Sequence, residues 1–214
     1  LDQLVRQAIY DLHATGGPGR VSLRRCFSTL QHQPAAQRLF EPYYERLRRE
    51  WPNVIASNET MALKITIAGV ALRLQATVDR IDKTSDGGVV AIFIRTGTAP
   101  LPTAADLRRN PAHTIHHALV ATAYPLKRPV RLQELWLHYN QAVTVEFNEH
   151  EYRHNLSRLR EPARDLARGQ VQARPGLHCD HCPFKHHGCP VYARQAPDFE
   201  SVSSDGKISQ RRWI

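Results

Sequence analysis

Three cysteines close together in the chain have the spacing of metal ligands. Cys179, Cys182 and Cys189 are separated by two and six residues, in a segment (175–190) rich in histidine and proline. Thiolates at this spacing converge on one soft metal centre. In a protein of the cell interior they favour a metal over disulfides. From the residues alone, zinc is a candidate, bound by the three thiolates and one of four histidines: His178, His181, His186 or His187.

Carboxylates and histidines form two further groups that could do chemistry. Asp79 and Asp82 flank Arg80 near the end of an alternating segment, and carboxylate oxygens are the ligands of hard cations. The same three residues could equally form an ion-pair cluster at a strand end. His113 and His117 have a spacing that lets two helical histidines bind zinc, although no glutamate follows His113 as in zinc proteases. A polar helix face is the alternative for this pair.

The charge of the chain favours a polyanionic partner. The 214 residues carry a net charge of +9 before any of the 12 histidines is counted, and nucleic acid is the commonest partner of such a surplus. An acidic protein, or solubility alone, is the alternative. No apolar run approaches the length of a membrane span, so we expect a cytoplasmic protein without a membrane partner, associated with the nucleoid if bacterial. Because the chain begins at Leu1, we expect a fragment of a longer protein.

The periodicity of apolar residues predicts an α/β fold. Its order of elements predicts a mixed central sheet flanked by helices. Expected helices lie at 2–13, 35–50, 111–123 and 149–168, and expected strands at 60–68, 70–81, 89–95, 131–139 and 142–147. The first three strands predict a meander, and 98–105 predicts a loop. We expect a core over 1–174, a cysteine-rich segment over 175–190 and a loosely ordered tail over 191–214, all belonging to one domain.

Two consecutive segments carry a family likeness. GVALRLQATVDRID (69–82) and GGVVAIFIRTG (87–97) resemble the core of the RecB-like nucleases of the PD-(D/E)XK superfamily. In that family a strand that starts at glycine ends in Asp-Arg-Ile-Asp, and the next strand ends in Asp-Tyr-Lys-Thr-Gly. The similarity extends over most of the chain and includes an upstream helix, a downstream helix and a closing cysteine segment. It implies a restriction-endonuclease-like core with a C-terminal cysteine-rich metal knot.

The resemblance also implies that the catalytic motif is degenerate. The family binds its cation through an aspartate, here Asp79, and through an acid of the next strand, where this chain has Phe93. The motif lysine is replaced by Arg95. Phenylalanine has no lone pair for a metal, and arginine effectively never deprotonates. Asp79 is then vestigial, Mg²⁺ is not expected at the old active site, and the chain is expected not to be an enzyme.

Two other motif positions also depart from the family. Arg6 takes the place of the metal-binding histidine of the upstream helix. The downstream Gln-x-x-x-Tyr pair reads as His113 and His117. With Asp79 as the remaining acid, Arg6 and Arg95 would point into a cleft that favours a phosphate without cutting it. The alternative, equally open from the sequence, is that both arginines are solvated and paired to Asp79. The residues expected to contact nucleic acid are Arg6, Arg80, Arg95, Arg108 and Arg109.

The family likeness further implies a [4Fe–4S] cluster. Cys179, Cys182 and Cys189 would be three of its ligands, and in the family a fourth cysteine lies far upstream. Cys26 is the other cysteine of this chain, but it follows the Arg6 helix, whereas the family ligand usually precedes it. The fourth ligand is therefore either Cys26 or a residue before Leu1, and zinc remains the alternative.

Together these features predict a catalytically degenerate nuclease domain that binds DNA, single-stranded by preference. We expect it to belong to a helicase–nuclease protein of DNA repair or recombination, with a helicase region of the UvrD or AddB kind as its partner. One alternative is an active metal-dependent nuclease with a displaced carboxylate: Asp82, Asp86 or Glu59. The other is a structural domain whose basic surface, including Arg46, Arg48 and Arg49, contacts an acidic protein.

Overall fold

The computed structural model describes residues 1–170, 175–176, 179–180, 182, 185, 189 and 191–192, with the backbone alone at 20–22. The chain divides into two compact units, 1–168 and 169–214. The expected tail lies outside the described residues, apart from 191–192. No helix in the described part of the chain is both long and apolar enough to cross a membrane.

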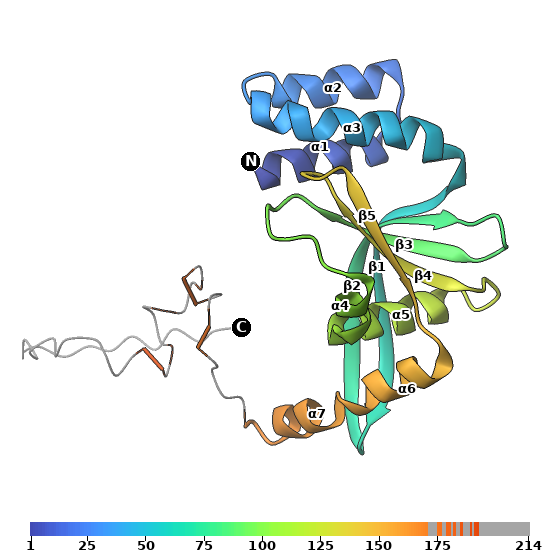
Figure 1. Cartoon of the computed structure of the whole chain (residues 1–214), viewed down its shortest axis with the longest axis vertical. Helices are drawn as coiled ribbons and strands as arrows, with labels where there is room; N and C mark the ends of the chain where they lie inside the picture. Colours follow the sequence, from blue (N-terminus) through green and yellow to red (C-terminus); the bar gives the residue numbers. More distant parts are fainter. Residues whose placement is uncertain are drawn as a thin grey trace, which may run out of the picture. The chain divides into compact units, whose positions relative to one another are not determined.

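Three helices form a layer on one face of the sheet (Figure 1). They are α1 (Asp2–Ala14), α2 (Arg20–Leu30) and α3 (Pro34–Glu50), followed by the short 3-10 turn η1 (Trp51–Asn53). Helix α1 ends at a turn where Gly17 has a φ of 101° and lies so close to Trp51 that a Cβ would be 2.1 Å from the indole. Glycine is therefore required there. The bounds of α1 and α3 were predicted to within one residue, whereas α2 was not predicted at all.

Five strands form one mixed sheet in the order β1-β2-β3-β4-β5. The strands are β1 (Val54–Ile67), β2 (Val70–Lys83), β3 (Val89–Arg95), β4 (Val130–Trp136) and β5 (Gln141–Glu146). Neighbours are antiparallel except β3 and β4, which are parallel. The predicted meander of the first three strands and the mixed sheet are confirmed. Strand β1 begins earlier than predicted.

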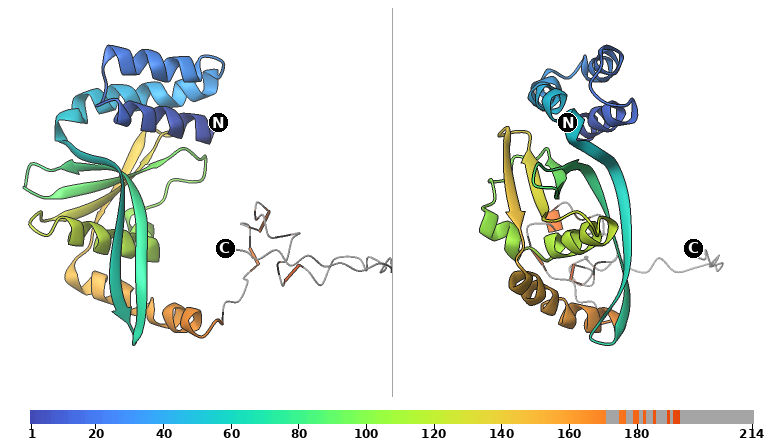
Figure 2. Two further views of the ribbon diagram at one scale, coloured as in Figure 1. Left: turned by 180° about the vertical axis from the view of Figure 1, so that it is seen from behind. Right: turned by 90° about the vertical axis from the view of Figure 1, so that its right-hand side faces the viewer.

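Four helices complete the first unit. The crossover from β3 to β4 contains α4 (Ala104–Arg109) and α5 (Pro111–Ala123), and such a connection is what a parallel pair requires. The predicted helix 149–168 is divided into α6 (Glu149–Ser157) and α7 (Arg160–Ala167). Helix α5 packs its apolar side chains against the face of the sheet opposite to α1–α3. Figure 2 shows the long β1–β2 hairpin extending beyond the other strands towards α6 and α7.

Candidate functional site

Asp79 lies where β2 and β3 separate. The β2–β3 ladder ends at the pair Arg80 and Ile92, and the Asp79 carboxylate takes the place of a backbone acceptor beyond it. Its Oδ2 accepts a hydrogen bond from the backbone N–H of Ile94 at 2.7 Å, and its Oδ1 accepts one from the Tyr10 hydroxyl at 3.3 Å. The side chain is buried. Both oxygens are therefore engaged by protein donors.

Arg6 connects helix α1 to this point. Its Nη2 donates to the carbonyl oxygen of Ile94 at 2.9 Å, and its Nη1 lies 3.9 Å from Oδ1 of Asp79. The structure thus brings together Arg6 and Asp79, two residues placed at motif positions by the sequence. The guanidinium is partly exposed, so it can contact an anion while it holds α1 against the separated strands.

Phe93 is part of an aromatic stack. Its buried ring lies 4.3 Å from that of His116, nearly parallel to it, and 6.0 Å from that of His113. Burial, followed by the nearby charges of His113 and Arg95, lowers the pKa of His116 to about 4. His116 is therefore neutral at pH 7. The position that the sequence resemblance matched to a metal-binding acid is here occupied by stacked rings.

Glu134 is a buried carboxylate that sequence reasoning missed. It is paired in register with Phe93 across the parallel β3–β4 ladder. Its Oε1 accepts hydrogen bonds from Nε and Nη2 of Arg95 at 2.9 and 2.6 Å and lies 3.3 Å from Nε2 of His113, while its Oε2 accepts one from the Trp136 indole at 3.1 Å. Burial would raise the pKa of Glu134, but the contacts with His113 and Arg95 lower it to about 2.

The expectation that Arg95 lies in a cleft without a second acid is therefore wrong. The Glu134 carboxylate neutralises the guanidinium of Arg95, because Nε and Nη2 both donate charge-assisted hydrogen bonds to its Oε1, and such bonds are stronger than neutral ones. The signal for Glu134 was present in the sequence. It lies between Leu132 and Trp136 on the apolar face of an alternating segment, where an unpaired charge would be costly.

His113 and His117 lie in different environments on α5. His113 is buried beside Glu134, whereas the ring of His117 packs against those of Phe147 and Tyr152 at 5.3 and 5.1 Å. Burial, followed by the charge of Arg128, lowers the pKa of His117 to about 4. The two rings therefore contact different neighbours, and the polar face expected for this helix is buried at His113 and partly buried at His117.

Arg80 is a core residue. Its side chain is 1% exposed, and its Nη2 pairs with Glu50 of α3 and, at 2.9 Å, with Asp82. Alternation along β2 turns it towards the layer of α1 and α3. The prediction that Arg80 contacts nucleic acid is therefore wrong. Arg80 and Asp82 instead form the ion-pair cluster at the strand end that was the alternative from the sequence.

The three carboxylates considered as displaced metal ligands have other partners. Asp82 pairs with Arg80, Asp86 accepts from Nη2 of Arg131 at 2.7 Å, and Glu59 accepts from the Tyr124 hydroxyl at 2.7 Å. The contacts of Asp79 described above involve none of these acids. The acid nearest in register to Phe93 is Glu134 instead.

Arg108 and Arg109 lie at the exposed end of α4. Nε of Arg108 is 3.7 Å from Glu151, and Nη2 of Arg109 is 3.4 Å from Asp106. The side chains are 41% and 71% exposed, so solvent screening makes both ion pairs weak. Both guanidinium groups are accessible to a phosphate.

Cys26 is buried in the layer of α1–α3. Its side chain is 0% exposed, and Sγ donates to the carbonyl oxygen of Ala8 at 3.2 Å. Burial, followed by the charge of Asp11, raises the pKa of this thiol to about 11. Cys26 is therefore a packed core thiol in this structure, and its role as the fourth ligand stays a prediction.

The three C-terminal cysteines are free thiols in the second unit. The backbone N–H of Gly176 donates to Sγ of Cys179 at 3.4 Å, and the N–H of Cys182 donates to the carbonyl oxygen of Cys179. Within the described part of the chain, no three histidine, cysteine, aspartate or glutamate side chains are placed to hold a metal ion. The four neighbouring histidines at 178, 181, 186 and 187 lie outside the described residues. The metal centre stays a prediction.

Comparison with known proteins assigns the fold. A sequence model of the PD-(D/E)XK nuclease superfamily matches residues 3–189. A protein from Eubacterium rectale, named as a proposed exonuclease, superposes with a TM-score of 0.50 at 12% identity, over 96% of this chain and 76% of that chain. The protein SSO0001 superposes with a TM-score of 0.45 at 18% identity, over 80% and 78% of the two chains. No curated protein matches the sequence. At these identities the first structure shows a shared fold.

Proposed function

The chain belongs to the PD-(D/E)XK nuclease superfamily, and from this premise we propose that it binds DNA without cleaving it. The proposal depends on the contacts of the Asp79 carboxylate and on the lack of an oxygen in the Phe93 side chain. Metal-dependent hydrolysis of a phosphodiester needs a cation that activates water, and hard cations need several oxygen ligands. Asp79 offers oxygens already engaged by Ile94 and Tyr10, and Phe93 offers none. These residues do not fit a catalytic divalent cation.

Glu134 does not restore the missing ligand. Arg95 and His113 surround its Oε1, and Trp136 donates to its Oε2. A cation at Glu134 would have to displace Arg95, whose charge already satisfies the carboxylate. Glu134 instead joins Arg95 of β3 to His113 of α5 through its Oε1.

Accessible cations support the binding of a polyanion. Arg6 is partly exposed at the opening between β2 and β3, and Arg108 and Arg109 project from α4. With the net charge of +9, these groups favour phosphate contacts that do not depend on the DNA sequence. On the basis of the RecB-like order of motifs, the proposal also includes a preference for single strands. It further includes membership of a helicase–nuclease protein of repair or recombination.

The cysteine segment extends the proposal to a metal centre. Cys179, Cys182 and Cys189 would hold a [4Fe–4S] cluster or, as the alternative, zinc. The N–H that Gly176 directs at Sγ of Cys179 is a donor of the kind that tunes cluster thiolates. When bound, the cluster would supply a rigid cross-link and no step of DNA chemistry.

The proposal is tested by measuring cleavage and binding on the same protein. Labelled single-stranded and duplex DNA is incubated with Mg²⁺ or Mn²⁺, and the Asp79→Asn variant is the control. We expect no cleavage that depends on Asp79. Fluorescence anisotropy at two salt concentrations should show binding that weakens as salt rises.

Two outcomes contradict the proposal. Cleavage by the wild type that is lost in Asp79→Asn means that the cation site is intact. Absence of DNA binding at low salt leaves the interaction with an acidic protein as the better hypothesis. Arg108→Glu with Arg109→Glu should weaken DNA binding, whereas Arg48→Glu with Arg49→Glu should weaken only binding to such a protein.

A further inference from the structure

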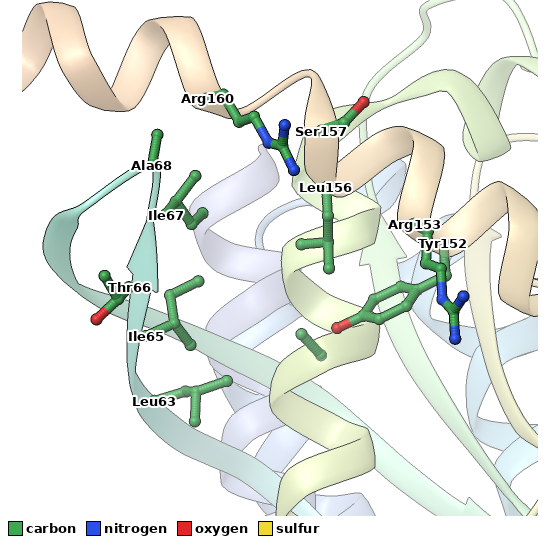
Figure 3. A pocket seen from close by; sticks show the side chains of 11 residues that line it. Leu63, Ile65, Thr66, Ile67, Ala68, Tyr152, Arg153, Leu156, Ser157 and Arg160 are labelled. Carbon is green, nitrogen blue, oxygen red and sulfur yellow. The ribbon is translucent and has the colours of Figure 1, made fainter.

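A pocket lies between the β1–β2 hairpin and the helices α5, α6 and α7, and neither Asp79 nor Glu134 lines it. Its volume is about 440 Å³, within the range of pockets that enclose a small ligand. Leu63, Ile65 and Ile67 of β1 form one wall, and Tyr152 and Leu156 of α6 form the opposite one (Figure 3). The pocket is open to solvent, so a chain could enter and leave it.

The lining of this pocket combines apolar surface with positive charge. Arginines 153 and 160 contribute to it, and no carboxylate does. Arg153 pairs with Glu149 at 2.7 Å. Among the described residues the Arg160 side chain has no hydrogen bond or ion pair, and its guanidinium is directed over Leu156 towards the pocket (Figure 3). Such a lining favours a ligand with a flat apolar body and an anionic group.

Tyr152 presents a ring in a fixed orientation. Its side chain extends across the pocket towards Leu63 and Ile65 (Figure 3). The ring of His117 supports it at 5.1 Å, and His117 in turn packs on Phe147. A ring that is already held loses little entropy when a second flat group stacks on it.

We propose that this pocket binds one nucleotide of single-stranded DNA, with the base against Tyr152 and the β1 wall and an adjacent phosphate at Arg160. The proposal rests on the proposed DNA binding and assigns it a place. Aromatic side chains beside cations are the means by which single strands are bound without regard to sequence. A duplex keeps its bases stacked inside and could not fill the pocket, so the site would favour single strands.

The test measures binding of a fluorescent oligothymidylate to the whole chain at several salt concentrations. Tyr152→Leu should weaken binding about 5- to 150-fold, the range for loss of one stacked base, and Tyr152→Phe should restore it. Arg160→Gln should weaken binding and lower the slope of log affinity against log salt by about 0.7, the value for one phosphate of a single strand. Arg164→Gln, on α7 but outside the pocket, is the matched control and should change neither.

The location is tested with an oligonucleotide containing 5-iododeoxyuridine. Ultraviolet cross-linking followed by mass spectrometry should identify Tyr152. If the wild type binds DNA and Tyr152→Leu and Arg160→Gln bind it with unchanged affinity, the pocket is not the binding site, but the proposed function stands. An apolar peptide as the true occupant of the pocket would give this result. Absence of DNA binding by the wild type overturns both.

Discussion

Replacing Arg80 should lower the free energy of unfolding, and the loss should be larger at alkaline pH. Its guanidinium is enclosed with the carboxylates of Asp82 and Glu50. Loss of one partner from a buried ion pair costs about 3–5 kcal/mol, and a pair at 4 Å in a surface-like dielectric gives a similar ~4 kcal/mol. We therefore expect Arg80→Ala to lower the free energy of unfolding by about 3–5 kcal/mol.

The pH dependence of this loss has a definite sign. Burial, opposed by Arg80, raises the pKa of Asp82 to about 6, above its ordinary 3.8. A raised pKa in the folded state gives stability at low pH that is lost as pH rises through that pKa. Without Arg80 the pKa of Asp82 rises further. The variant should therefore lose less stability at pH 5, where Asp82 is protonated, than at pH 8.

Urea denaturation followed by circular dichroism at pH 5 and pH 8 checks this prediction. Arg73→Ala, an exposed arginine on the same strand, is the matched control and should change stability by less than about 0.5 kcal/mol. A loss below about 1 kcal/mol in Arg80→Ala, combined with weaker DNA binding, would show that Arg80 contacts nucleic acid after all and would refute the reasoning.

Three further predictions concern Glu134, Asp79 and the cysteines. In thermal denaturation, Glu134→Gln should lower the free energy of unfolding by about 1–3 kcal/mol, and this difference should shrink as pH falls from 4.5 to about 2. Because the substitution frees Arg95, the slope of log affinity for single strands against log salt should rise by about 0.7. An unchanged slope would show that Arg95 stays shielded. Asp79→Ala should cost about 1–3 kcal/mol in urea denaturation, because it leaves a buried N–H unpaired; an unchanged midpoint would contradict this. Cys189→Ala should abolish bound iron or zinc in anaerobically purified protein, whereas Cys26→Ala should leave the metal content unchanged; loss of metal in the second variant would identify Cys26 as a ligand.

The sheet could be predicted because its signals are local. Alternation of apolar and polar residues in 70–81 and the apolar run of 89–95 determine which faces are buried, and the turn at 85–88 joins the two strands. Helix α4 was missed although Thr103 and Asp106 form a capping box, because six residues provide too little periodicity. Helix α2 was missed because an arginine-rich segment hides its apolar stripe.

The partners of charged residues could not be predicted in the same way. Arg80 and Arg95 have the same residue type and lie on adjacent strands, but one is sealed beneath α3 and the other is paired with Glu134. Asp82 is a local partner of Arg80, but Glu50 and Glu134 come from elements far away in the chain. The motif positions indicated where Asp79 and Arg6 would lie, but only packing determines which cations are left for a ligand.

The stack of Phe93 on His116 has a consequence for how this chain could change over time. A single substitution that placed an acid at position 93 would put a second negative charge beside Glu134 on the neighbouring strand, where both positions are buried. Two such charges resist ionisation together, so the new acid would be protonated and would bind no metal. An acid at position 93 would therefore bind a cation only if a neighbouring group, His116 or Glu134, were replaced as well.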